Sequence, residues 1–201
     1  MMVSRSRKLL AWCTGVVFAA TLCLASVSAA ADSQLLMAWQ AVKARDAVVL
    51  MRHAIAPGVG DPPGFESGNC KTQRNLSDAG REQARRIGDV FRANGIAEAQ
   101  VLSSEWCRCL ETAELLSLGQ PIPADMLNSF FADRHEEPDQ TRALRGSLEQ
   151  WVENEQAGAV VLVTHQVNIT ALTGQFVGSG DMLLVTIAND QPEVLARIRT
   201  D

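Results

Sequence analysis

Two of the three histidines in this 201-residue chain come directly after apolar runs that are typical of buried strands. His53 follows residues 47–51 with only Arg52 between, and His165 follows residues 160–163 after one threonine. A continuous apolar run indicates a strand that is covered on both faces, as in a parallel sheet. Because ligand sites in such sheets form beyond the carboxyl ends of the strands, we expect the two imidazoles to meet at one edge.

Two arginines are placed to join these histidines. Arg52 precedes His53, and Arg108 lies in the first turn of a helix expected after a strand at 101–102. Guanidinium groups need paired acceptors, which a phosphate supplies, and a helix N-terminus adds a dipole of the favourable sign. A neutral imidazole held through its second nitrogen can attack phosphorus. Each residue alone would also fit a capped strand end or a solvated charge, but together they predict a phosphoryl-transfer site.

Strands and helices alternate along most of the chain. Helices are expected where apolar residues recur at helical spacing between caps: 34–44, 78–94, 105–118, 140–155 and a fifth from Asn168. Strands are expected at 47–51, 101–102, 124–127, 160–163, 183–187 and 194–198. Residues 54–75 are rich in Gly, Pro and Asp and form a long loop, of the kind that is usually functional. This order predicts a three-layer α/β/α domain with a largely parallel central sheet.

The first thirty residues differ from the rest. Basic residues precede an apolar run at 9–27 that ends in small residues with A-x-A-like cleavage options. We interpret residues 1–30 as a secretory signal peptide and residues 31–201 as the folded domain. The alternative is an uncleaved membrane anchor, since about 19 apolar residues could just span a bilayer. We therefore expect a periplasmic or secreted protein that touches the membrane only through this segment.

The composition limits the partners. With 47% hydrophobic and 20% charged residues the chain is an ordinary globular protein rather than a disordered one. Its net charge of −5, which becomes more negative once the basic signal segment is removed, excludes a general nucleic-acid binder. Any anionic ligand must therefore be held by a local site.

Three cysteines remain after the signal segment, in a compartment that permits disulfides. Cys107 and Cys109 cannot easily pair, because positions two apart on a helix point roughly 200° apart. We therefore predict a disulfide between Cys70 and either Cys107 or Cys109. We favour Cys107, because it shares its side of the helix with Glu111 and lies nearer any loop over the site. Three buried free thiols are the alternative. No cysteine or histidine spacing fits a zinc site, and we expect no metal and no cofactor.

Four segments resemble blocks of the histidine phosphatase superfamily, whose fold is phosphoglycerate mutase-like. They occur in family order and cover about residues 48–173: Leu-Met-Arg-His-Ala at 50–54, Asn-Leu-Ser-Asp-Ala-Gly-Arg-Glu-Gln-Ala at 75–84, Ser-Ser with the later Arg and Thr-Ala at 103–113, and Val-Thr-His at 163–165. The resemblance implies that His53 is the nucleophile and becomes phosphorylated. Arg52, Arg108 and His165 would bind the phosphoryl oxygens and stabilise the in-line transition state.

The general acid has no clean match to the family. Expelling an alkoxide needs a proton, usually from a carboxylic acid near the phosphate, and carboxylates cluster at 130–139, before the second histidine. We favour Glu136, because Pro138 stiffens the turn just after it, with Asp133 and Glu137 next. The alternative is a charged surface turn that supplies acids to a helix start. Ala54, where many members have Gly, and the following Pro-Gly also depart from the pattern.

These patterns predict an exported phosphomonoesterase of the histidine acid phosphatase type that acts through a phosphohistidine. Its compact length and export make the lipopolysaccharide core heptose phosphate phosphatases the nearest analogy, which rests on resemblance alone. The expected partner is a small phosphorylated substrate or a phosphorylated envelope glycan. Two alternatives remain: an envelope protein that binds phosphate groups without turnover, and a thiol enzyme that uses Cys107 or Cys109.

Overall fold

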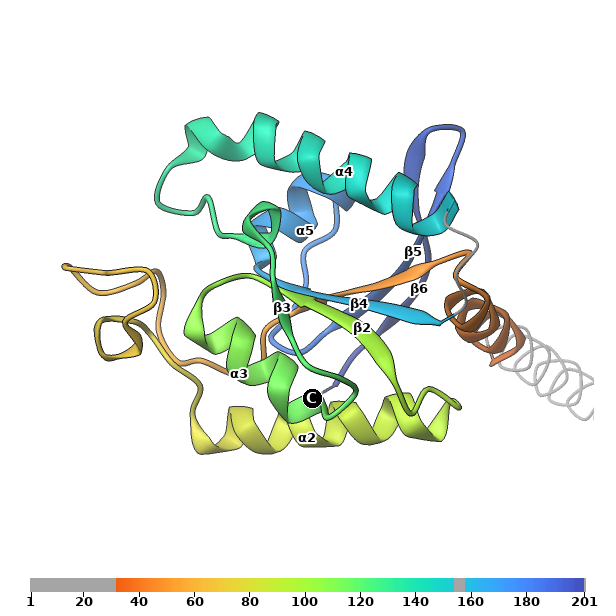
Figure 1. The fold of residues 1–201 in the computed structure, drawn as a ribbon, viewed down its shortest axis with the longest axis horizontal. Helices are drawn as coiled ribbons and strands as arrows, with labels where there is room; N and C mark the ends of the chain where they lie inside the picture. Colours follow the sequence, from red (N-terminus) through yellow and green to blue (C-terminus); the bar gives the residue numbers. More distant parts are fainter. Residues whose placement is uncertain (1–31, 154–157, 201) are drawn as a thin grey trace, which may run out of the picture. The chain divides into compact units, whose positions relative to one another are not determined.

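The computed structural model describes residues 32–153 and 158–200 (Figure 1). The expected signal segment, residues 1–30, lies outside the described residues. The chain divides into a unit of residues 1–37, in which 32–37 are helical, and a unit of residues 38–201, which contains all the features below. Within the described ranges, no helix is long and apolar enough to cross a membrane.

Six strands form one mixed sheet in the order β3-β2-β4-β1-β5-β6. Their bounds are β1 Val48–Arg52, β2 Ala99–Ser103, β3 Ile122–Pro123, β4 Ala159–Thr164, β5 Met182–Ala188 and β6 Gln191–Ile198. The strands β3, β2, β4 and β1 are parallel neighbours, whereas β5 pairs antiparallel with β1 and with β6. The expectation of a largely parallel sheet is therefore confirmed, with the β5–β6 hairpin as the antiparallel part.

Helices cover both faces of this sheet. Their bounds are α2 Asp78–Ala93, α3 Cys107–Leu116, α4 Glu137–Glu153 and α5 Gln166–Thr173, and residues 38–44 are also helical. Figure 1 shows α2 and α3 on one face and α4 and α5 on the other. Alternate residues of β1 face opposite cores: Val49 and Met51 pack with Ile87 of α2, whereas Leu50 packs with Leu144 of α4. The predicted three-layer α/β/α fold is confirmed.

The loop of residues 54–75 is fixed to the start of α2 by local contacts. The Ser77 side chain caps α2 by accepting a hydrogen bond from the Gly80 amide at 3.1 Å, as its position before the helix predicts. Gly80 lies so close to this loop that a Cβ there would collide with the Ile55 carbonyl oxygen. Ile55 also accepts a hydrogen bond from the Ser77 amide at 3.0 Å. The base of the loop is thus held against the helix.

The prediction of a strand at 124–127 is wrong. The strand is the two-residue β3, Ile122–Pro123, and residues Asp125–Leu127 form a single 3-10 turn. Pro123 lacks an amide donor, so it is tolerated only at an edge of the sheet, where β3 lies. The helix expected at 105–118 is shorter, Cys107–Leu116, because Ser117 adopts a left-handed conformation with φ of 53° and ends it.

Candidate active site

The ends of β1 and β4 bring His53 and His165 together. These strands pair in parallel with Arg52 opposite Thr164, so the next residue of each lies at the same edge of the sheet. The His53 amide donates to the Thr164 carbonyl at 3.0 Å, and the two imidazole centroids are 5.5 Å apart. Both side chains are buried. The expected convergence of the two histidines is confirmed.

The imidazole of His53 is arranged as a neutral ring with one open nitrogen. Its Nδ1 lies 2.7 Å from the Ala54 carbonyl oxygen, which can only accept, so Nδ1 carries the proton. Burial, together with the charges of Arg108 and Arg52, lowers the pKa of His53 to about 3 against the opposing effect of this bond. The lone pair of Nε2 is therefore available down to acidic pH.

His165 is held by a chain of hydrogen bonds. Its Nδ1 lies 3.4 Å from Nη2 of Arg108, which can only donate, so Nε2 carries the proton and donates to Oγ of Ser104 at 2.9 Å. The Ser104 hydroxyl donates in turn to Oδ1 of Asn128 at 3.1 Å. Burial, followed by the nearby His53 and Arg108, holds the pKa of His165 well below its usual value. His165 is thus a neutral ring that orients Arg108.

The two predicted arginines flank the histidines with donors left over. Arg108 is 2% exposed, and Arg52 donates from Nη1 to the Val177 carbonyl at 3.1 Å. The Nε atoms of both arginines are buried and have no hydrogen-bond partner among the residues that the structure describes. Burial and the charge of Arg108 lower the pKa of Arg52. Such a site favours binding of an anion, which would satisfy both donors and relieve the repulsion.

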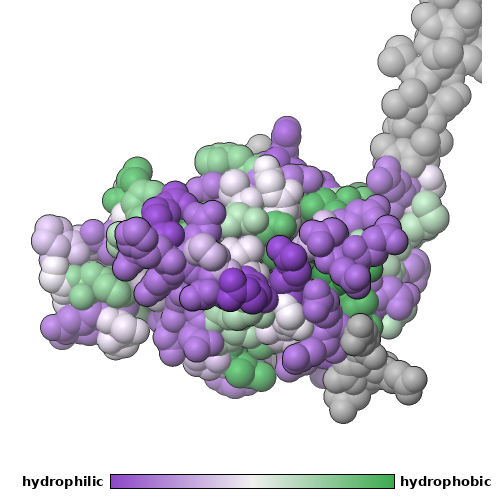
Figure 2. Space-filling view, turned by 90° about the horizontal axis from the view of Figure 1, so that it is seen from above, coloured by the Kyte–Doolittle hydropathy of each residue, from purple (hydrophilic) through white to green (hydrophobic). Residues whose placement is uncertain are grey.

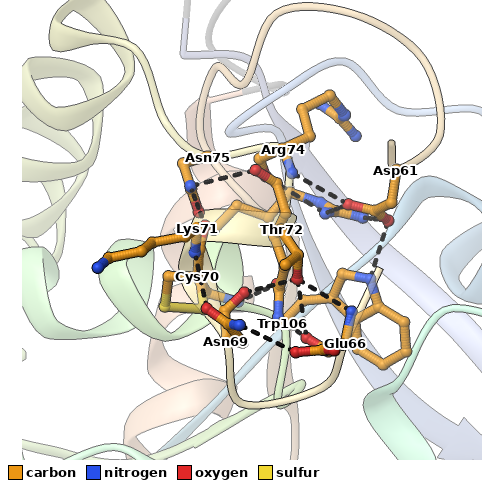
Figure 3. Close-up of a disulfide and its surroundings, with 12 residues drawn as sticks. Asp61, Glu66, Asn69, Cys70, Lys71, Thr72, Arg74, Asn75 and Trp106 are labelled. Carbon is orange, nitrogen blue, oxygen red and sulfur yellow. Dashed lines mark hydrogen bonds and ion pairs between the residues drawn. A yellow bond between two sulfur atoms is a disulfide. The ribbon is translucent and has the colours of Figure 1, made fainter. Parts of the chain in front are cut away.

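The loop of residues 54–75 contributes a carboxylate that sequence reasoning missed. Oδ1 and Oδ2 of Asp61 lie 2.7 and 3.1 Å from Nη1 and Nη2 of Arg108, and Oδ2 also accepts from Nε1 of Trp106 at 3.0 Å (Figure 3). Burial alone would raise the pKa of Asp61, but the bond to Arg108 and its charge outweigh this and lower the pKa. Asp61 therefore occupies one bidentate side of the Arg108 guanidinium as an anion.

Arg74 is a second residue of this loop that was not anticipated. Its Nε donates to the Gly60 carbonyl at 2.8 Å and its Nη1 to the Ala56 carbonyl, while its amide donates to Oδ1 of Asp61 at 3.2 Å. Arg74 thus closes the loop on itself and adds a third guanidinium beside Arg108. No sequence pattern marks either residue, because both act through contacts that only the folded loop creates.

The predicted disulfide is confirmed: Cys70 and Cys107 are bonded (Figure 3). It ties the loop to the first residue of α3, next to Trp106 and Arg108. Cys109 is free and buried, and burial raises its pKa to about 12. A disulfide-bonded sulfur and a protonated thiol are both poor nucleophiles, which disfavours the thiol-enzyme alternative.

One pocket, with a volume of about 660 Å³, is lined by the two histidines, the three arginines and Asp61. Its lining includes the four residues that we call the floor: Arg52, His53, Arg108 and His165. It also includes two of the three candidate acids, Asp133 and Glu136. Glu136 is exposed, and its Oε2 accepts from Nε2 of Gln140 at 3.4 Å.

The other two candidate acids have local partners. Asp133 accepts from the His135 amide at 3.0 Å and so caps a 3-10 turn, and Glu137 pairs with Arg134 at 3.3 Å outside the pocket lining. Of the three candidates, Glu136 is therefore the one at the pocket without a capping role or an arginine partner in these contacts. Within the described ranges, no group of three or more His, Cys, Asp or Glu side chains is arranged to hold a metal ion.

Comparison with known proteins places these observations in a family. The sequence profile of the histidine phosphatase superfamily (branch 1) matches residues 48–130, a range that includes Arg52, His53 and Arg108. No curated protein matches the chain.

Several solved structures share the fold. A putative phosphohistidine phosphatase SixA from Agrobacterium tumefaciens has 19% identity and a TM-score of 0.52 over 76% of this chain and 97% of that chain. A mycobacterial glucosyl-3-phosphoglycerate phosphatase in complex with VO3 has 17% identity and a TM-score of 0.55, over 74% and 96% of the two chains. A phosphoserine phosphatase from Entamoeba histolytica, in complex with 3-phosphoglyceric acid, has 12% identity and a TM-score of 0.55, over 77% and 98%. At these identities the likeness shows the fold.

Proposed function

Because the chain belongs to the histidine phosphatase superfamily, we propose that it is a phosphomonoesterase that works through a phosphohistidine on His53. The family and the fold support a phosphatase in general terms. The observation behind the finer proposal is the state of the floor: a neutral imidazole with an open Nε2 lies beside two buried arginine Nε donors without partners. A phosphoryl group would satisfy the donors and receive the nucleophile.

The reaction then runs in two steps. In the first, Nε2 of His53 attacks phosphorus, the bond from phosphorus to the ester oxygen breaks, and Glu136 gives its proton to the departing alkoxide. In the second, water attacks the phosphohistidine, the phosphorus–nitrogen bond breaks, and Glu136 takes the proton back. The net change is one ester and one water converted to one alcohol and one phosphate.

The arginines stabilise the charge that the phosphoryl oxygens carry in both transition states. Arg52 and Arg108, which both line the pocket, would donate to these oxygens. The prediction that His165 also binds these oxygens remains untested, because its proton goes to Ser104 in this structure. As placed, it supports the phosphate through Arg108.

Export and substrate are part of the proposal. The Cys70–Cys107 disulfide supports a periplasmic or secreted location, because disulfides persist in oxidising compartments. The low pKa of His53 supports a histidine acid phosphatase type, because the nucleophile stays unprotonated in acid. A phosphorylated envelope glycan or a small phosphorylated molecule would be the substrate.

A turnover assay with a panel of phosphate monoesters tests this function. Sustained phosphate release, and a trapped phosphoenzyme that is acid-labile and alkali-stable at His53, are the expected results. Stoichiometric binding of phosphate esters without release would instead favour an envelope protein that only captures phosphate groups. Label trapped at a serine or a cysteine would overturn the assignment of the nucleophile.

A further inference from the structure

Apolar side chains from separate segments gather at the solvent end of the pocket. We call Val59, Phe65, Trp106, Phe131 and Phe176 the pocket mouth. Val59, Phe131 and Phe176 are 86%, 47% and 67% exposed, whereas the two histidines of the floor are almost fully buried. Phe131 and Phe176 are the two exposed phenylalanines among the described residues, and both line this pocket. Hydrophobic residues scattered singly need no explanation, but a gathering at one opening indicates a binding surface.

Large apolar side chains are also exposed outside the pocket lining, at Leu35, Leu36, Met37, Ile55 and Ile122. In the face seen in Figure 2 hydrophilic residues predominate, and hydrophobic ones form small separate patches. The loop of residues 54–75, which supplies Val59 and Phe65 to the pocket mouth, projects from the body of the fold in Figure 1.

The inner part of the pocket mouth presents flat rings. Phe65 stacks on Trp106 with centroids 5.0 Å apart and an interplanar angle of 22°. The indole nitrogen of Trp106 is fixed by Asp61, and its ring meets that of His165 edge-on at 5.5 Å. This wall therefore begins beside the floor and continues outward. The alcohol part of an ester whose phosphate is bound at the floor would therefore extend along these rings.

The charges of the pocket are divided unequally between its two ends. The cationic side chains in its lining are Arg52, Arg74 and Arg108, all at or beside the floor. The carboxylates toward the opening are those of Asp133 and Glu136, and neither is paired with an arginine or a lysine in a salt bridge. A second anionic group on the substrate would meet these two carboxylates. The guanidinium of Arg134, which lies 5.9 Å from the Phe131 ring centroid, is already paired with Glu137.

We propose that the pocket mouth selects the alcohol part of the substrate, an inference that rests on the proposed function. It takes a phosphate monoester whose alcohol bears a ring with an apolar face and no second anionic group. The volume of about 660 Å³ is far more than one phosphate fills, so the alcohol occupies most of the pocket. Bisphosphates and carboxylated phosphate esters are excluded by the same carboxylates.

Three esters with nearly equal leaving groups separate shape from chemistry. These are ethyl phosphate, 2-phenylethyl phosphate and 2-(4-carboxyphenyl)ethyl phosphate. We expect kcat/KM for the phenylethyl ester to exceed that for the ethyl ester by about tenfold or more, as for a modest apolar contact, and the added carboxylate to cancel this gain. Equal values for the first two esters, or no loss from the carboxylate, would overturn the proposal.

Phe131→Ala should lower the ratio of kcat/KM between the phenylethyl and ethyl esters by about tenfold. Ile122→Ala is the matched control, because Ile122 is also 47% exposed but lies on β3 outside the pocket lining, and it should leave the ratio unchanged. The same shift in both variants would contradict a role of the pocket mouth.

Binding distinguishes failure of this inference from failure of the proposed function. Calorimetry with His53→Ala measures the affinity for the three esters without turnover. If the wild type hydrolyses no ester, the proposed function fails, and the order of affinities still decides the present inference. Tighter binding of the phenylethyl ester supports it, and equal binding overturns it.

Discussion

The floor and the loop of residues 54–75 meet at Arg108 but are held in different ways. Three of the four floor residues sit at strand ends, where the sheet fixes the backbone, and Arg108 lies in α3. The His53 amide pairs with Thr164, and the Arg52 amide pairs with the Asp181 carbonyl at 3.1 Å. The loop is held by side chains, through the Asp61–Arg108 ion pair and the disulfide. A floor fixed by the sheet suits preorganised chemistry, whereas a loop tethered by one disulfide and one ion pair is less constrained.

The largest effect should come from the floor. His53→Ala removes the nucleophile, so turnover should fall by a factor on the order of 10⁶ and no phosphoenzyme should form. The measurements are steady-state phosphate release and trapping of labelled phosphoenzyme. His135→Ala is the matched control, since His135 is exposed and outside the pocket lining, and it should retain full activity. A labelled His53→Ala protein would show that the chemistry is not on the floor.

The candidate acid at the pocket should have the next largest effect. Glu136→Gln should slow alkyl phosphates by about 10² or more, because their alkoxides need a proton, while sparing p-nitrophenyl phosphate, whose leaving group does not. The measurement is kcat for both substrates, with Glu137→Gln as the control outside the pocket lining. Equal effects on both substrates, or none, would place the proton donor elsewhere.

Removing the disulfide should lower stability and loosen the attachment of the loop to α3, while the positions of the floor residues stay the same. The bond closes 37 residues of chain, so replacing Cys70 and Cys107 by Ser should lower the free energy of unfolding by about 3–4 kcal/mol. KM should rise more than kcat falls, because the loop and its Phe65 would no longer be held beside α3. Urea unfolding and steady-state kinetics measure both. A loss of kcat alone would mean that the loop belongs to the chemical site.

The difference between the floor and the loop also explains which site residues the sequence could predict. His53, His165 and Arg52 were predictable because apolar strand runs mark their positions and parallel strands bring their ends together. Asp61 and Arg74 were not, since Asp61 meets Arg108 47 positions along the chain and no local pattern encodes that contact.

Two predictions away from the floor had opposite outcomes. A disulfide from Cys70 was predictable despite lying in the loop, because helix geometry excluded the pair Cys107–Cys109. The choice of Cys107 over Cys109 rested on its place on the wetter side of the helix, nearer the loop. The strand expected at 124–127 failed because its few apolar residues fit a 3-10 turn over the core as well as an extended strand. Short apolar runs do not distinguish the two.

Asp61→Asn tests whether the loop and the floor compete for Arg108. An incoming phosphate dianion would share Arg108 with the Asp61 carboxylate, and the amide removes that like charge. Inhibition by vanadate should therefore tighten by about tenfold, which is about 1.4 kcal/mol. Titration of vanadate against turnover gives the inhibition constant. Weaker inhibition would mean that Asp61 orients Arg108 for the phosphate and that the two regions act as one.

A pH dependence of stability should separate the two regions by their titration windows. The pKa of His53 is about 3 in the folded protein and about 6.5 when unfolded, so between these values only the unfolded chain takes up the proton. The free energy of unfolding therefore falls as pH drops through this window, by at most about 1.4 kcal/mol per pH unit for each such histidine.

Asp61 acts in a lower window with a linkage of the same sign. Its folded pKa is depressed below 3.8, so the stability that it adds is complete above that value and is lost only as pH falls through the folded pKa. Between pH 7 and pH 4.5 only the floor should respond. Urea unfolding at these two pH values should show a loss in the wild type that is about 2 kcal/mol larger than in His53→Gln. Asp61→Asn should show the same loss as the wild type, because its window has not been reached. If Asp61→Asn instead removed the loss, the charge of the loop and the protonation of the floor would be one coupled system.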